Sequence, residues 1–185
     1  MDLEKMGFKG NTDFSDEMKV LKVALENEVT GRNLYLQYAE KVRSDLAKKV
    51  FAHLANEELN HIRDITEYME SVRKGTAVDV DKMISDASLK RTEEFFGKMA
   101  SHFSEQVAPA DDDNKAREIA MEVEKRGYEY YEKAMGVART LKLRKFFKWL
   151  MEQEQSHFML IRNAFEFSND PDSWFARHEH WTLEG

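Results

Sequence analysis

The sequence contains no cysteine and has little proline or glycine. Its 185 residues include two Pro and eight Gly. Without cysteine the chain cannot form disulfides, thiolate nucleophiles, iron–sulfur clusters or cysteine-ligated zinc sites. Any metal ion bound by this chain must therefore use oxygen and nitrogen ligands. The scarcity of Pro and Gly favours long helices, which these two residues would interrupt.

Long apolar runs and blocks of basic residues are also missing. No apolar stretch approaches the roughly 20 residues that a membrane-spanning helix needs, and residues 1–10 lack the apolar core of a signal peptide. The net charge is −7, which argues against a nucleic-acid partner and against an anionic membrane surface. We therefore expect a cytoplasmic protein that binds neither nucleic acid nor membranes.

Four long amphipathic helices are predicted, and they account for most of the chain. Apolar residues recur three and four positions apart, as a buried helix face requires. The expected helix caps are Ser15, Ser44 or Asp45, one of Asp111 to Asp113, and Thr140. The predicted spans are about 15–43, 44–75, 111–139 and 140–168.

The connections between these helices predict the topology. One-residue breaks near 44 and 140 would make two antiparallel hairpins. The connection 76–110 is long enough to run back along the bundle, which would place the third helix parallel to the second. It contains a short amphipathic stretch with Phe96, Met99 and Phe103 on one face. We expect an all-α four-helix bundle of two antiparallel hairpins with a long crossover, in which 1–185 form one domain, with an N-terminal segment 1–14 and a tail 169–185, containing Trp174, Phe175 and Trp181, laid over the bundle.

The second hairpin repeats the first. Each matching pair is separated by 96 positions, as from 28 to 124 and from 61 to 157. A single offset held across two helices without a gap is hard to obtain by chance. The matching pairs are Glu28 and Glu124, Gly31 and Gly127, Tyr35 and Tyr131, Ser44 and Thr140, Phe51 and Phe147, Leu54 and Leu150, Glu58 and Glu154, and His61 and His157.

The repeat carries a pattern typical of metal ligands. The second and fourth helices each contain Glu-x-x-His, whose two side chains share a helix face and can hold one ion. The first and third helices each add one glutamate at matching depth, roughly 23 Å from the nearest turn. One Glu-x-x-His is usually solvated, but two copies with paired glutamates are far more specific. The predicted ligands are Glu28, Glu58, His61, Glu124, Glu154 and His157.

Charge balance indicates two divalent cations at this site. Four buried glutamates without counter-ions would repel one another and resist ionisation, whereas two divalent ions balance their charge. Oxygen and imidazole ligands suit iron or manganese, and zinc could also bind but has no redox chemistry. We therefore expect two iron ions, with manganese or zinc as alternatives. Other glutamates, Glu26, Glu57, Glu122 and Glu152, are expected to face solvent or the surroundings of the ligands.

Two tyrosines and two glycines follow the ligand glutamates of the first and third helices. Tyr35 and Tyr131 lie two turns after Glu28 and Glu124, where each could donate a hydrogen bond to a ligand carboxylate; core packing is the alternative. They are the candidate catalytic residues. Gly31 and Gly127 lie three residues after the same glutamates. They either allow tight packing or leave room for a small oxidant or a water.

These residues resemble the rubrerythrin branch of the ferritin-like superfamily over roughly 20–165. The resemblance implies a di-iron centre that reduces peroxide or reacts ferrous ions with oxygen. Two features depart from the family pattern. A chain without cysteine cannot contain the rubredoxin-type domain of full-length rubrerythrins, and Gly127 stands where rubrerythrins carry an additional glutamate.

Three functions are open at this point. The first is a di-iron oxidoreductase that reduces hydrogen peroxide or dioxygen with electrons from an external donor protein, as a homodimer or small homo-oligomer. The second is a ferroxidase that stores iron in a shell, as ferritins do. The third is a bundle that uses metal only for stability. The tail contains Pro171 and does not resemble the short fifth helix of ferritins, which favours the first function, and the complete duplicated ligand set argues against the third.

Overall fold

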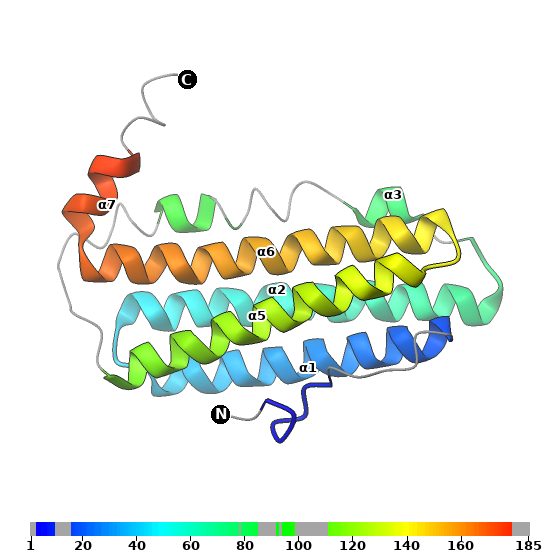
Figure 1. Cartoon of the computed structure of the whole chain (residues 1–185), viewed down its shortest axis with the longest axis horizontal. Helices are drawn as coiled ribbons and strands as arrows, with labels where there is room; N and C mark the ends of the chain where they lie inside the picture. The colour runs from blue at the N-terminus through cyan, green and yellow to red at the C-terminus, as the bar shows by residue number, and fades with distance from the viewer. Residues whose placement is uncertain are drawn as a thin grey trace.

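The computed structural model describes residues 3–9, 16–77, 79–84, 92, 94–98 and 111–178, without the side chains of 111, 175, 177 and 178. All regular structure in these ranges is helical. The long helices are α1 (Glu17–Lys41), α2 (Asp45–Lys74), α5 (Asp111–Val137) and α6 (Leu141–Asn169), and the short ones are α3 (Val80–Met83) and α7 (Pro171–His178). The long helices form one bundle (Figure 1). The predicted all-α four-helix bundle is confirmed.

The predicted helix boundaries follow from local hydrogen bonds. Ser44 Oγ accepts a hydrogen bond from the backbone N–H of Ala47, and Thr140 Oγ1 accepts one from Leu143, so both predicted caps are confirmed. Gly75 ends α2 in the left-handed conformation, with φ of 64°. At the start of α1 the cap is Asp16, whose carboxylate accepts from two backbone N–H groups. Ser15, the predicted cap, lies outside the described residues.

The described parts of the connection between the two hairpins lie along the bundle. Figure 1 shows α2 and α5 running in one direction and α1 and α6 in the other, as predicted. Near the start of α6, Lys145 Nζ lies 3.0 Å from Asp81 Oδ1 of α3. Near its end, the ring of Phe96 packs against Phe167. Met99 and Phe103, the other two residues of the predicted apolar face, lie outside the described residues.

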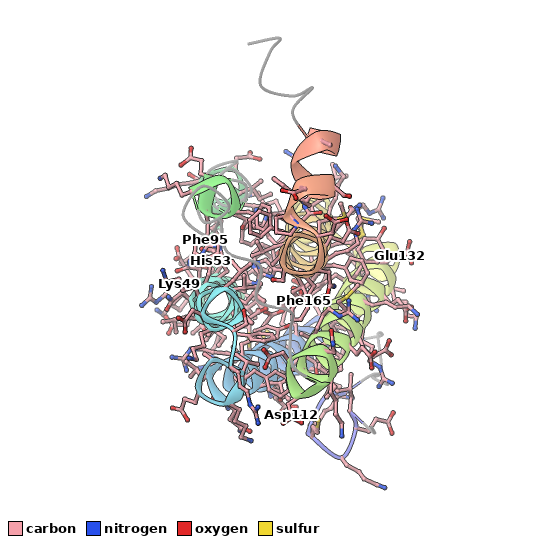
Figure 2. All side chains as sticks on the ribbon, turned by 90° about the vertical axis from the view of Figure 1, so that its left-hand side faces the viewer. Lys49, His53, Phe95, Asp112, Glu132 and Phe165 are labelled. Carbon is pink, nitrogen blue, oxygen red and sulfur yellow. The ribbon has the colours of Figure 1, made fainter. Side chains whose placement is uncertain are left out.

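The described part of the connection and the start of α5 also contact the first hairpin. The ring of Phe95 stacks on His53 of α2 with centroids 4.1 Å apart (Figure 2). The carboxylate of Asp113 accepts hydrogen bonds from the backbone N–H groups of Arg43 and Ser44, at 2.9 and 3.0 Å. Asp113 is only 1% exposed, so it fixes the beginning of the second hairpin to the turn of the first.

The tail differs from the prediction. Residues 171–178 form the short helix α7, although the tail with Pro171 did not resemble a short fifth helix in the sequence. The physical reason is that Pro171 occupies the first helical position, where its missing N–H breaks no helical hydrogen bond and its fixed φ suits the helix. Trp174 is 8% exposed and packs against Phe167 and Phe96, so this part of the tail does cover the bundle. Trp181 and the side chain of Phe175 lie outside the description.

The N-terminal segment 3–9 lies against the bundle near the middle of α1 (Figure 1). Its backbone folds into a compact turn in which Phe8 N–H donates to the carbonyl of Leu3, and Gly7 adopts a positive φ of 99°. Leu3 and Phe8 are buried in the same core cluster as Tyr35 and Val123. The segment is therefore part of the packed structure. No described helix is long and apolar enough to cross a membrane.

Candidate metal centre

The structure brings the predicted ligand residues together inside the bundle. α1 supplies Glu28, α2 supplies Glu58 and His61, α5 supplies Glu124, and α6 supplies Glu154 and His157. All of them are buried, and Glu124 and His157 are fully inaccessible. They meet because each lies at the same depth on the inward face of its helix, as the spacing from the turns predicted.

These residues form two overlapping groups. One consists of Glu28, Glu58, His61 and Glu154, and the other of Glu58, Glu124, Glu154 and His157. Within each group, one potential ligand atom from every residue lies within 4.8 Å of all the others. Glu58 and Glu154 belong to both groups, so their carboxylates lie between the two. This arrangement can hold two ions that share two carboxylates.

The histidines face the groups with their Nδ1 atoms. His61 Nδ1 lies 3.1 Å from Glu28 Oε2 and 3.2 Å from Glu58 Oε2. His157 Nδ1 lies 3.5 Å from Glu58 Oε1 and 3.5 Å from Glu124 Oε2. The two imidazole rings are nearly parallel, with centroids 5.2 Å apart. Each histidine therefore points one nitrogen at one of the groups.

The two tyrosines cross between the hairpins. Tyr35 of the first hairpin donates its hydroxyl hydrogen bond to Glu124 of the second, and Tyr131 of the second donates to Glu28 of the first. Burial and the neighbouring carboxylates raise the pKa of both phenols well above the usual value, so both remain protonated donors. The hydrogen bonds fix Glu28 and Glu124 in place, while the catalytic role predicted for the tyrosines stays a proposal.

The electrostatics of the site show the cost of burying these groups without cations. Burial, and then the charge of Glu58, raises the pKa of Glu28 to about 8. Burial and the surrounding carboxylates raise the pKa of Glu154 well above its usual value. Burial disfavours a charged His157, but Glu124 and Glu58 outweigh it and raise its pKa to about 9. Where no cation is bound, protons on Glu28, Glu154 and His157 therefore offset part of the buried negative charge.

The donor atoms fit metal ions. Glu124 Oε2 and Glu154 Oε1 are buried and have no hydrogen-bond partner among the described residues. Such orphaned acceptors are rare in folded proteins and call for a missing partner. Carboxylate oxygens and neutral imidazoles, without sulfur, are the ligands that iron and manganese take in proteins. The residues present therefore match the group that the sequence predicts.

The two equivalent glycines have different surroundings. A Cβ atom at Gly127 would lie 2.3 Å from Glu154 Oε2, which is too close for any real contact. A Cβ at Gly31 would meet its nearest neighbour, Val123, at an ordinary 3.8 Å. At Gly127 the space is thus occupied by the carboxylate of Glu154, and the expectation of room for an oxidant does not hold there. The missing side chain instead lets Glu154 lie against α5.

This asymmetry predicts different effects for the two alanine substitutions. Gly127→Ala should displace the Glu154 carboxylate and weaken iron binding by about 10- to 100-fold, as loss of support around a ligand does. Gly31→Ala should leave iron binding unchanged. It should raise the free energy of unfolding of the apoprotein by up to about 1 kcal/mol, because alanine favours the helix more than glycine does. Titration of each apoprotein with ferrous iron measures the effect. Equal affinities in the two variants would contradict the role of Gly127.

Several residues near the centre were not predicted from the sequence. Phe8 and Asn27 line a pocket that reaches the ligand carboxylates. Gln153, next to Glu154, is completely buried, and neither of its side-chain polar atoms has a hydrogen-bond partner among the described residues. Glu57, at the equivalent position of α2, is also buried, so the solvent-facing placement expected as one alternative for it is wrong. The sequence signal that relates the two residues is the repeat, because Glu57 and Gln153 are separated by the same 96 positions as the ligand pairs.

A helical bundle with two groups of buried glutamates and histidines that share two carboxylates defines the ferritin-like class. The rubrerythrin family model matches residues 19–165, and the chain therefore belongs to the rubrerythrin family, a ferritin-like di-iron family. The resemblance predicted from the ligand pattern is confirmed. Neither the search of curated proteins nor that of solved structures gave a significant match.

Proposed function

We propose that the protein is a di-iron oxidoreductase that reduces hydrogen peroxide or dioxygen with electrons from a separate donor protein. The observation that carries the proposal is the pair of overlapping groups that share Glu58 and Glu154. A single structural ion needs one group, whereas two adjacent ions can together deliver two electrons to one oxidant. The ligands Glu28 and His61 would hold one ion, and Glu124 and His157 the other.

The chain's own residues support this chemistry in three ways. Two ferrous ions would supply the two electrons that, with two protons, convert hydrogen peroxide into two water molecules. The hydroxyl groups of Tyr35 and Tyr131 keep the carboxylates of Glu124 and Glu28 oriented. The apolar residues packed around the centre exclude bulk water, which strengthens the electrostatic interactions inside it. The phenol groups of Tyr35 and Tyr131, whose hydroxyls are held at the ligand carboxylates, are the residues that we propose to pass protons to the reduced oxidant.

Continuous turnover should require an added donor. The sequence has no cysteine, so it cannot contain a cysteine-ligated relay cluster, and electrons must enter from another molecule. In stopped-flow mixing of the diferrous protein with peroxide, we expect one rapid oxidation for each site and then no further reaction until a reductase is added. Sustained peroxide consumption without any donor would contradict the need for a partner. Absence of oxidation by both peroxide and oxygen would favour a purely structural metal.

Iron oxidation and storage is the second candidate, and α7 supports it. The helical tail removes the argument that the chain lacks a short helix after the fourth bundle helix. Storage needs a closed shell of many subunits, whereas the proposed oxidoreductase is a homodimer or small homo-oligomer. Native mass, together with the number of irons retained after loading, distinguishes the two. A large assembly that holds far more than two irons for each chain would select storage.

A further inference from the structure

A small pocket connects the ligand carboxylates with the N-terminal segment. It lies between α1 and α5, and its inner wall includes the carboxylate residues Glu28, Glu58 and Glu154. Phe8 lines it from the side of the N-terminal segment. The volume open to the centre of a water-sized sphere is about 10 Å³, which is room for roughly one water molecule. The pocket therefore reaches the candidate metal centre but holds only a very small molecule.

One residue of the pocket lining, Phe8, comes from outside the four-helix bundle. Gly31 on α1 and Gly127 on α5 both line the pocket and have no side chains to close it. Phe8 is 3% exposed and belongs to the same core cluster as the apolar residues around the site. Phe8 thus adds an aromatic side chain to the lining of a pocket to which the two helices contribute glycines.

The segment that carries Phe8 is held by specific hydrogen bonds. Asn27 Oδ1 accepts from the backbone N–H of Lys9 at 2.8 Å, and Asn27 Nδ2 donates to the carbonyl of Lys9 at 3.1 Å. Asn27 directly precedes the ligand Glu28 in α1. A backbone position that is bound in both directions is well fixed, and Phe8 is its immediate neighbour. The position of the ring is thus linked to the helix turn that carries the ligand.

We propose that Phe8 determines which molecules reach the metal centre. With its ring in place the pocket admits an oxidant close to water in size, such as hydrogen peroxide or dioxygen, and excludes bulkier organic hydroperoxides and chelators. The inference rests on the proposed function, because it takes the metal centre as the site that the pocket serves. It adds a specificity-determining residue that lies outside the helices carrying the ligands.

The test compares Phe8→Ala with the parent and with Met6→Ala. Met6 belongs to the same segment and packs on the same core cluster but does not line the pocket, so its substitution controls for general loosening. The anaerobic diferrous proteins are mixed with the chelator ferrozine, and iron release is followed by absorbance. We expect release from Phe8→Ala to be about tenfold faster or more, and release from Met6→Ala to stay near the parent rate. The rate of iron release from Phe8→Leu, which keeps an apolar side chain, should lie between the rates of Phe8→Ala and the parent.

A second measurement addresses the oxidant itself. The ratio of oxidation rates with tert-butyl hydroperoxide and hydrogen peroxide should rise about tenfold or more in Phe8→Ala and not in Met6→Ala. Equal iron release and an equal rate ratio in parent, Phe8→Ala and Phe8→Leu would overturn the role of Phe8. If no peroxide oxidises any of the proteins, the proposed oxidoreductase function fails, and the chelator rates still decide whether Phe8 controls access. If Phe8→Ala does not fold, Phe8→Leu decides by the same criteria.

Discussion

Replacing Glu58 or Glu154 with alanine should remove most of the bound iron. Each of these carboxylates belongs to both candidate groups, so each substitution takes a ligand from both ions at once. Truncation also leaves the cations in a buried site with fewer counter-charges. We expect less than about half of the roughly two irons for each chain that a site of this class holds. Elemental analysis of the purified, iron-loaded variants measures this directly.

The matched controls follow from the same geometry. Glu28→Ala removes a ligand from only one group and should retain about one iron. Glu152→Ala removes a carboxylate two residues before Glu154 that pairs instead with Lys148, and it should retain the full content. Full iron retention in both Glu58→Ala and Glu154→Ala would contradict the assignment of the centre.

Removing the metal should strongly destabilise the fold at neutral pH. A ligand present at a thousandfold excess over its dissociation constant stabilises the folded state by about 4 kcal/mol for each site. For a domain of this size two such sites correspond to a rise in Tm on the order of 20 °C. Thermal unfolding of the apoprotein, the iron-loaded protein and the reloaded protein measures the difference. A metal-free protein as stable as the loaded one would indicate that the buried glutamates are not a metal site.

The difference in stability between the metal-free and the loaded protein should widen between about pH 4.5 and 9. The pKa of Glu28 rises from 4.5 to about 8 on folding. The stability that its protonated form contributes to the metal-free protein is therefore lost between about pH 4.5 and 8. The pKa of His157 rises from 6.5 to about 9 on folding, and the stability that its protonated form contributes is lost between about pH 6.5 and 9. Bound metal replaces these protons and binds more tightly as the pH rises. A difference in Tm between the apoprotein and the loaded protein that does not change with pH would contradict this.

The sequence predicted the bundle and the ligand residues because both depend on short-range rules. The period of the apolar residues and the caps at Ser44 and Thr140 define the helices. A Glu-x-x-His pair is a property of one helix turn. The constant repeat offset then transfers every inference about the first hairpin to the second. Each of these signals is contained within one helix or one hairpin, which is why sequence spacing alone was sufficient.

The contacts that cross between elements could not be predicted in the same way. The tyrosine hydroxyls bind glutamates of the opposite hairpin, whereas spacing along one helix relates each tyrosine only to the glutamate of its own helix. Asp113 caps the turn of the other hairpin for reasons that depend on the packed structure. Pro171 begins α7, although proline more often marks the end of a helix.

The N-terminal segment had the weakest sequence signal. Phe8 stands in a short stretch with no helical period, and nothing in the sequence relates it to a position on α1 some twenty residues later. The structure relates them through the two hydrogen bonds between Lys9 and Asn27. The role of Gly127 was likewise hidden, because the repeat equates it with Gly31 while only the structure shows that Glu154 fills its space.

The most direct test of a two-metal centre is anomalous diffraction at the iron absorption edge from crystals of the iron-loaded protein. The geometry predicts two strong peaks inside the bundle, roughly 3.5–4 Å apart as in other two-metal sites. One should lie beside Glu28 and His61 and the other beside Glu124 and His157, with Glu58 and Glu154 contacting both. A single peak, or peaks confined to surface carboxylates, would contradict the dinuclear centre.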